Sequence, residues 1–390
     1  MTDLQKIKLL EKEIGRKLPL IKLEDIGKFF NGYAINEDKR VVGLDLDLSF
    51  NPESNRLKTI PEIVFLFREL TNICLCNNII NLENDFTLPT KLTHLALSGN
   101  SIRKIPDWMC ELKGLKSLDL SWNQLEILPE EFGELKGLQT LGLAGNQMEY
   151  LPEAIGKLRG LQTLKLKRNQ LEVVPDWIGE LKELERLDLS ENQLKTVPVT
   201  IGELKGLNDL NLSWNQLEYL PEAIGEINGL KELKLSVNQL KTLPEAIGEL
   251  KGLKSLCLYD NQLKVVPEAI GELKGLKSLD LSKNKLEVVP DWIGELKGLQ
   301  TLCLIDNQLK VVPEAIGELK ELLQLDLSRN QLKSIPEEML DIGLDIYMIN
   351  TNTTGIFLGG NPLETPPVEV AEQGNDAIRS YFESLRGEKS

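Results

Sequence analysis

The stretch Leu115-Lys-Ser-Leu-Asp-Leu-Ser-Trp-Asn-Gln-Leu125 decides the fold, because its pattern LxxLxLxxNxL returns again and again along the chain. The asparagine of the pattern occupies eleven positions spaced by 23 residues, from Asn100 to Asn330. Copies with other spacing place asparagines at Asn51, Asn78 and Asn361, which gives about fourteen repeats in a chain of 390 residues. A fixed period of this length is the signature of a stacked repeat architecture, in which neighbouring units complete one continuous core.

Each repeat is expected to contain a short strand with one buried face. In the quoted stretch, an alternation of period two sends Leu118 and Leu120 inward and leaves the polar residues beside them outward. The asparagine that follows has an amide able to bond the backbone of adjacent repeats, so its column predicts a buried ladder and not a catalytic site. The other half of the repeat, such as Leu128-Pro-Glu-Glu-Phe-Gly-Glu-Leu135, begins with proline and carboxylates and breaks at glycine, which predicts one or two helical turns. The sequence therefore predicts an α/β solenoid with a curved parallel sheet on its concave face and short helical turns on its convex face.

These repeats resemble those of the leucine-rich-repeat family, and the resemblance covers roughly residues 41–364. Residues 1–40 are expected to form an N-terminal cap, a helix with Leu4, Ile7, Leu10 and Ile14 on one stripe followed by a hairpin. Residues 365–390 are expected to form a C-terminal capping helix and linker, with an apolar stripe of Ile378, Tyr381, Phe382 and Leu385.

The C-terminal run from Asn361 to Phe382, with NPLxxP followed by PPxEV and QGNxAIxxYF, is similar to the junction that closes the repeat region of Roco proteins. That resemblance implies that a Ras-like GTPase domain called Roc, followed by a dimerising domain called COR, is the natural neighbour of these repeats. No segment of the chain contains GxxxxGK[ST], the loop whose amides and lysine hold phosphates. The chain is therefore not itself the GTPase.

Composition argues against several other classes of function. A net charge of −15, from 45 basic and 60 acidic residues, repels phosphate backbones and anionic lipid, so we expect neither nucleic acid nor membrane as a partner. The charged N-terminal segment and the odd number of five cysteines favour a cytoplasmic protein without disulfides. A single histidine, His94, and the absence of a third ligand beside Cys74-x-Cys76 in the sequence argue against a metal, a cofactor or catalysis.

Candidate binding residues come from the outward columns, because residues 23 apart are expected to occupy one column on neighbouring strands. In the column before the asparagine, Trp122 stands between Gly99 and Gly145, so its ring either awaits a partner or folds down over a glycine. Exposed tryptophan is enriched among binding hot spots, which makes Trp122 the main candidate. The other residues that break the column pattern are Trp214, Tyr259, Ile305, Lys165, Lys167 and Arg168.

The charged members of these columns have a structural explanation as well. Lys165 and Arg168 stand one repeat before Asp188 and Glu191, and Asp306 stands between Lys283 and Arg329, so both sets are expected to form charge pairs.

These observations predict a protein-binding and regulatory domain, not an enzyme, whose first candidate partner is a Roc-COR GTPase of the same polypeptide. Two alternatives remain open on the sequence. One is a free-standing bacterial scaffold or effector without a GTPase. The other is the substrate-recruiting arm of a ubiquitin ligase, whose catalytic cysteine would have to lie beyond Ser390, because none of the five cysteines here has a basic partner in the sequence pattern.

Overall fold

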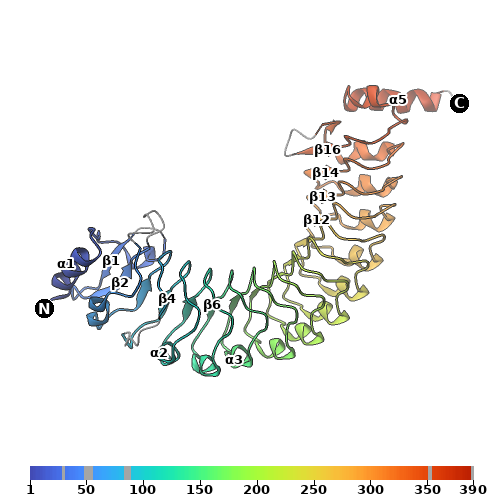
Figure 1. Cartoon of the computed structure of the whole chain (residues 1–390). Coiled ribbons are helices and arrows are strands. Elements are labelled where there is room, and N and C mark those ends of the chain that lie inside the picture. The colour runs from blue at the N-terminus through green and yellow to red at the C-terminus, as the bar shows by residue number, and fades with distance from the viewer. Residues whose placement is uncertain (29–30, 48–55, 83–88, 350–353, 388–390) are drawn as a thin grey trace. The chain divides into compact units, whose positions relative to one another are not determined.

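The computed structural model describes residues 1–28, 31–47, 56–82, 89–349 and 354–387 and divides the chain into two compact units, Met1–Asn192 and Gln193–Ser390. In each unit, short strands follow one another along one face and helical turns lie on the opposite face (Figure 1). The strands of the 23-residue repeats pair in parallel with their neighbours in the sequence, as the repeat pattern predicts. Asn51, the first asparagine expected in the pattern, lies outside the described residues, and the pairing of Leu44 with Ile73 puts this first copy two residues earlier than an alignment on Asn51 predicts.

The first unit begins with a helix and an antiparallel hairpin, and parallel strands continue from the hairpin. Its strands are β1 (Gly32–Ile35), β2 (Val41–Asp45), β3 (Asn72–Cys74), β4 (His94–Ala96), β5 (Ser117–Asp119), β6 (Thr140–Gly142), β7 (Thr163–Lys165) and β8 (Arg186–Asp188). Its helices and 3₁₀ turns are α1 (Asp3–Glu13), η1 (Leu23–Asp25), η3 (Glu62–Leu66), α2 (Asp107–Cys110), η4 (Glu130–Glu134), α3 (Glu153–Gly156) and η5 (Asp176–Glu180).

The second unit continues the pattern and ends in two helices. Its strands are β9 (Asp209–Asn211), β10 (Glu232–Lys234), β11 (Ser255–Cys257), β12 (Ser278–Asp280), β13 (Thr301–Cys303), β14 (Gln324–Asp326), β15 (Ile346–Tyr347) and β16 (Gly355–Phe357). Strand β16 pairs with β14, and β15 lies at the edge beyond β16. Its helices and 3₁₀ turns are η6 (Val199–Glu203), η7 (Glu222–Glu226), η8 (Glu245–Glu249), η9 (Glu268–Glu272), η10 (Asp291–Glu295), η11 (Glu314–Glu318), η12 (Glu337–Ile342), α4 (Val368–Ala371) and α5 (Asn375–Gly387). Within the described residues, no helix is both long and apolar enough to cross a bilayer.

The asparagine column forms the predicted ladder. The Nδ2 of Asn238 donates to the carbonyl oxygens of Leu212 and Leu235, both at 3.0 Å, and its Oδ1 accepts from the amide of Leu217 at 3.0 Å. Each asparagine thus satisfies backbone groups of its own repeat and of the preceding one, which otherwise would be buried without partners. The leucines around it, such as Leu233, are fully buried.

The convex segments are mostly single 3₁₀ turns that follow a proline, whereas the sequence predicted one or two helical turns. Glycine in these segments allows close approach between neighbours: a Cβ at Gly248 would lie 2.5 Å from the carbonyl oxygen of Ala269 in the next repeat. The missing side chain thus lets the turns of adjacent repeats lie in direct contact.

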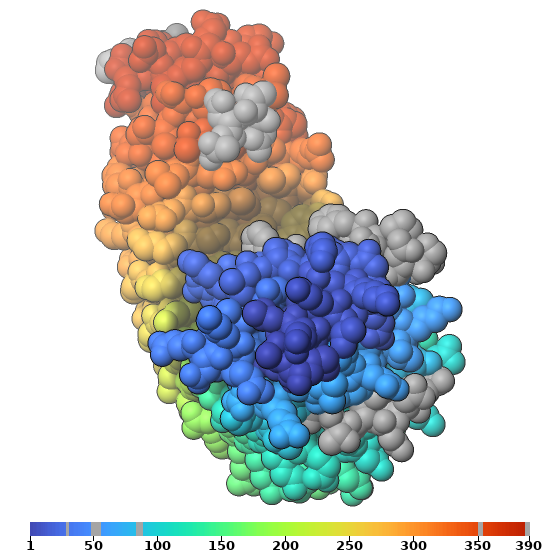
Figure 2. Space-filling model, turned by 90° about the vertical axis from the view of Figure 1, so that its left-hand side faces the viewer, coloured from blue at the N-terminus to red at the C-terminus, as the bar shows by residue number. Residues whose placement is uncertain are grey.

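The N-terminal helix differs from its predicted stripe. Ile7 and Leu10 are buried as expected, but Leu4 is 42% exposed, and Asp3 and Lys6 are buried in its place. The carboxylate of Asp3 bonds Lys6, Arg40 and the Val41 amide, so this polar group joins the helix to β2. In Figure 2, which looks onto the N-terminal end of the first unit, the dark blue residues of α1 and the hairpin cover this end of the stack.

At the other terminus, helix α5 contacts the last repeats through Asn375 and Ile378 in its first turns and through Arg386 in its last turn, which pairs with Glu337 of η12 at 3.1 Å. Asn375 accepts a hydrogen bond from the Ile346 amide at 3.0 Å and donates to the Leu344 carbonyl at 2.9 Å, as the ladder asparagines do. Of the predicted apolar stripe, Ile378 is fully buried, whereas the other three side chains are only partly covered.

Candidate protein-binding face

The candidate residues of the column before the asparagine lie in a turn that follows each strand, and not on the strand as the column argument assumed. Their backbone is left-handed, with φ between 50° and 58° at Trp122, Arg168, Glu191, Trp214, Val237, Asp260, Lys283, Asp306 and Arg329. This conformation lets the chain turn the asparagine inward while the preceding side chain projects outward. It is uncommon for residues other than glycine and asparagine, and the sequence pattern of Leu and Asn does not reveal it.

Trp122 is 51% exposed and has two neighbours of its own in the same column. Its ring covers Gly145, since a Cβ there would lie only 2.7 Å from Cε3 of the indole. The guanidinium carbon of Arg168 lies 5.2 Å from the centre of the ring, a cation–π distance. The ring thus folds over a glycine, which is one of the two arrangements that the sequence allowed. Half of the side chain nevertheless remains exposed to a partner.

The charge pairs beside Trp122 form differently from the prediction. Glu191 pairs with Lys167 at 2.9 Å, and not with Arg168, because Arg168 stacks on Trp122. Lys165 stands in register with Asp188 across β7 and β8 and is exposed. We call the set Trp122, Lys165, Lys167 and Arg168 the Trp122 patch, and all four belong to the first unit.

A second group of candidates lies in the second unit. Lys283 Nζ is 5.1 Å from the centre of the Tyr259 ring, and a hydrogen bond with Tyr259 raises the pKa of Lys283. Asp306 pairs with Arg329 at 3.5 Å as expected, whereas the predicted contact with Lys283 is replaced by the tyrosine. Ile305 is half-buried, and Trp214 is exposed in its left-handed turn.

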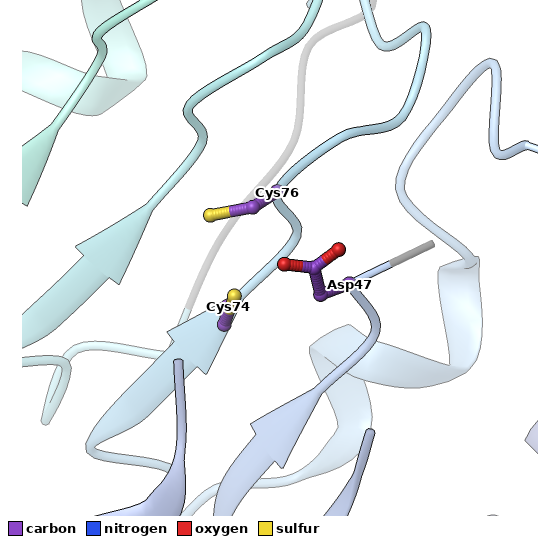
Figure 3. Close-up of side chains that lie close together, drawn as sticks. All are labelled: Asp47, Cys74 and Cys76. Atoms are coloured by element: carbon purple, nitrogen blue, oxygen red, sulfur yellow. The ribbon is translucent and has the colours of Figure 1, made fainter. Parts of the chain in front are cut away.

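A cluster that could hold a metal lies at the start of the first unit, where Asp47, Cys74 and Cys76 have their ligand atoms within 4.8 Å of one another (Figure 3). The hydrogen bond between the two thiols raises the pKa of Cys74, with burial adding to the effect, and lowers the pKa of Cys76. Burial also raises the pKa of the adjacent Asp45. The sequence contained a signal for this carboxylate: aligning Leu44-Asp-Leu-Asp47 with Ile73-Cys-Leu-Cys76 sets the two aspartates beside the two cysteines.

Comparison with known proteins identifies the repeats. A family model described as a leucine-rich repeat region matches residues 107–219 and 215–341, and a second leucine-rich repeat model matches residues 68–125. No curated protein matches the chain.

Among solved structures, a leucine-rich repeat protein of Leptospira interrogans is 33% identical, with 83% of this chain and 92% of that chain covered and a TM-score of 0.58. The Arabidopsis receptor kinase HAESA, solved with a peptide hormone and a co-receptor, is 28% identical over 80% of this chain and 62% of that chain, with a TM-score of 0.56. An internalin of Listeria monocytogenes shares the fold at 23% identity, with 74% and 81% coverage and a TM-score of 0.65. The repeat period, the asparagine ladder and these matches together show that the chain belongs to the leucine-rich repeat family.

Proposed function

We propose that this chain is a protein-binding scaffold and that the Trp122 patch is its principal contact surface. The observation that carries the proposal is the half-exposed indole of Trp122, held between Gly145 and Arg168. A side chain already fixed in position loses little conformational freedom on binding, which favours its use as an anchor. Members of this family generally serve in protein–protein interaction, which supports a binding role for this chain.

The chemistry of the patch favours a partner with an apolar side chain flanked by carboxylates. The chain as a whole carries a net charge of −15, but Arg168 stacks on the indole, and Lys165 and Lys167 belong to the same repeat as Arg168, although Lys167 is paired with Glu191. Lys165 is exposed and Arg168 stacks on the ring, so both cations lie where an incoming carboxylate would meet them.

We further propose that the partner is a GTPase region of the Roc-COR type and that binding regulates it. The support for this finer proposal is the run from Asn361 to Phe382, which resembles the junction before the GTPase in Roco proteins. Asn361 there accepts from the Leu332 amide as a ladder residue, and α4 and α5 follow it directly.

Titration calorimetry of the full chain against a purified Roc-COR region tests both proposals, the Trp122 patch as the contact surface and the GTPase region as the partner. Trp122→Ala is expected to weaken association about thirtyfold, since loss of a hot-spot ring costs about 2 kcal/mol or more. Tyr150→Ala is the matched control, because this aromatic is also exposed but lies in the segment between Asn146 and α3. Asp306→Ala, whose charge is paired with Arg329, is expected to change the affinity little.

Two results would contradict the proposal at different levels. Equal affinities for the wild type and Trp122→Ala would move the contact surface away from the patch. Absence of binding to the GTPase region would favour the second candidate, a free-standing scaffold. That candidate is supported by the Leptospira protein, which this chain covers over 92% of its length.

A further inference from the structure

We propose that Asp47, Cys74 and Cys76 bind one thiophilic divalent cation of the Zn²⁺ class, at a structural site that ties the first repeats together. The site lies outside the Trp122 patch and is independent of the proposed protein binding. Figure 3 shows both sulfur atoms and the carboxylate bordering one common space. All three side chains are buried, with exposures of 3% for Asp47, 1% for Cys74 and 8% for Cys76.

The register of the first strands brings the three ligands together. Asp45 of β2 pairs with Cys74 of β3, so two residues further on Asp47 stands beside Cys76. Residues two apart on an extended segment share a face, which directs both thiols to the same side. The cation would thus bridge two successive repeats, joining the hairpin strand β2 to the parallel strand β3.

The distances fit one ion. The three ligand atoms lie within 4.8 Å of one another. Zinc binds sulfur at about 2.3 Å and carboxylate oxygen at about 2.0–2.2 Å in a tetrahedron, so its ligand atoms stand roughly 3.5–4 Å apart. Small side-chain rotations would suffice to close the cluster around a cation. Two thiolates with one carboxylate select zinc or a similar soft ion over Ca²⁺ and Mg²⁺, which require oxygen ligands.

The surroundings hold the carboxylate ligands in place. The Nδ2 of Asn77 lies 3.2 and 3.1 Å from the two oxygens of Asp47 and donates to them. Gly99 packs against Asn77 so closely that a Cβ there would lie 2.6 Å from Asn77 Oδ1. Such hydrogen bonds to metal ligands fix their orientation and typically change affinity about 10–100-fold.

Asp45 borders this group of three ligands without belonging to it, so we assign the fourth position to a water molecule beside Asp45. Asp45 is fully buried beside Cys74, and its oxygens accept from the Gly27 amide at 2.7 Å and the Asp47 amide at 3.0 Å. A second buried carboxylate therefore stands next to the three ligands. A divalent cation offsets this concentration of acidic groups, whose burial as anions is otherwise costly.

The test uses the reduced full-length chain and Co²⁺ as a spectroscopic probe, with Zn²⁺ as competitor. The wild type is expected to bind one equivalent of Co²⁺ with thiolate-to-cobalt charge-transfer bands, and Zn²⁺ is expected to abolish them. Cys74→Ser/Cys76→Ser should lose the bands, and Asp47→Asn or Asn77→Ala should weaken Co²⁺ binding at least tenfold. The matched control is Cys257→Ser/Cys303→Ser, which removes two cysteines from later strands and should leave the bands unchanged.

Failure of the wild type to show thiolate-to-cobalt bands would overturn the proposal, whatever the folding of the variants. Bands that persist in Cys74→Ser/Cys76→Ser, or that disappear in the Cys257→Ser/Cys303→Ser control, would also overturn it. A rise in the wild-type melting midpoint on addition of Zn²⁺, reversed by a chelator and absent from the Cys74→Ser/Cys76→Ser variant, would support the structural role.

Discussion

The residue before each ladder asparagine serves two purposes. The fold requires its left-handed backbone, and the candidate binding face uses its outward side chain. Val237 is a β-branched residue at φ 54°, a conformation that is unfavourable for such side chains. Its amide nevertheless donates to the Tyr259 carbonyl at 2.8 Å, so the ladder and the neighbouring repeat impose the turn. Strain at this position is therefore a cost of presenting a side chain outward, and it can be relieved by the right substitution.

Val237→Asn is expected to stabilise the protein by about 1 kcal/mol, because asparagine tolerates the left-handed region better than a β-branched residue. The measurement is the free energy of unfolding in urea. Val265→Asn serves as the control, since Val265 is an exposed valine that does not have a positive φ, whereas Val237 is half-buried in its left-handed turn. An equal gain at both positions would mean that polarity, and not backbone strain, is responsible.

Asn238→Ala is expected to destabilise the protein by about 1–3 kcal/mol. The substitution leaves the Leu217 amide and the carbonyls of Leu212 and Leu235 without this partner in a buried environment. Asn228→Ala, in an exposed convex segment, is the matched control and should have little effect. A thermal midpoint of Asn238→Ala equal to that of the wild type would show that the hydrogen bonds of the asparagine ladder do not stabilise the protein.

At the residue scale, the sequence predicts the roles of buried side chains more reliably than the contacts of side chains that project from the core. The asparagine amides were predictable because a repeated buried polar group needs repeated partners. The stacking of Arg168 on Trp122 was not predictable. It depends on the left-handed turn and on the ion pair that Glu191 forms with Lys167 instead of with Arg168. Two cations compete there for one carboxylate, and spacing alone does not decide between them.

At the scale of elements, the N-terminal helix shows how a polar group can take the place of an apolar stripe. Lys6 Nζ bonds Asp3 at 2.8 Å and the Leu66 carbonyl at 2.7 Å and lies 5.5 Å from the Phe67 ring centre. Because these contacts tie α1 to η3 and β2, the helix is oriented by Asp3 and Lys6 and turns Leu4 to solvent. A period-3.6 pattern identifies such a helix but not its rotation when polar residues find partners.

Asp3→Asn is expected to destabilise the protein by about 3 kcal/mol at neutral pH, because it leaves a buried lysine without its counter-ion. Burial alone would raise the pKa of Asp3, but hydrogen bonds from Lys6, Arg40 and the Val41 amide, with the Lys6 charge, bring it below its ordinary value. A lowered pKa in the folded state stabilises the protein above about pH 4, and the contribution is lost as the pH falls below that value.

The measurement is the free energy of unfolding of both proteins between pH 7 and pH 3. The difference between the wild type and Asp3→Asn should shrink as the pH falls below about 4. A difference that stays constant over this range would show that the Asp3 charge is not responsible.

At the scale of the whole molecule, stability is a sum over neighbouring repeats. The convex surface repeats a Lys–Glu contact between successive turns, as in Lys205–Glu226 at 2.8 Å and Lys274–Glu295 at 3.0 Å. Such exposed pairs contribute at most about 1 kcal/mol each and are screened by salt. The buried leucines and asparagines, which every internal repeat provides in the same places, therefore carry most of the stability.

This additivity makes internal repeats dispensable in a way that the ends are not. Deletion of residues 239–261 removes one complete period and rejoins Asn238 to Gln262, so each remaining leucine and asparagine regains an equivalent neighbour. We expect this variant to remain monomeric and to unfold cooperatively, with only a modest fall in its melting midpoint.

We propose residues 1–40 and 365–390 as caps, so a fragment of residues 92–337 should expose leucine-lined ends and aggregate. Size-exclusion chromatography with thermal denaturation compares the three proteins. A monomeric, cooperatively folding fragment would show that the terminal segments are not needed to seal the core, and an aggregating deletion variant would show that the internal repeats are not equivalent.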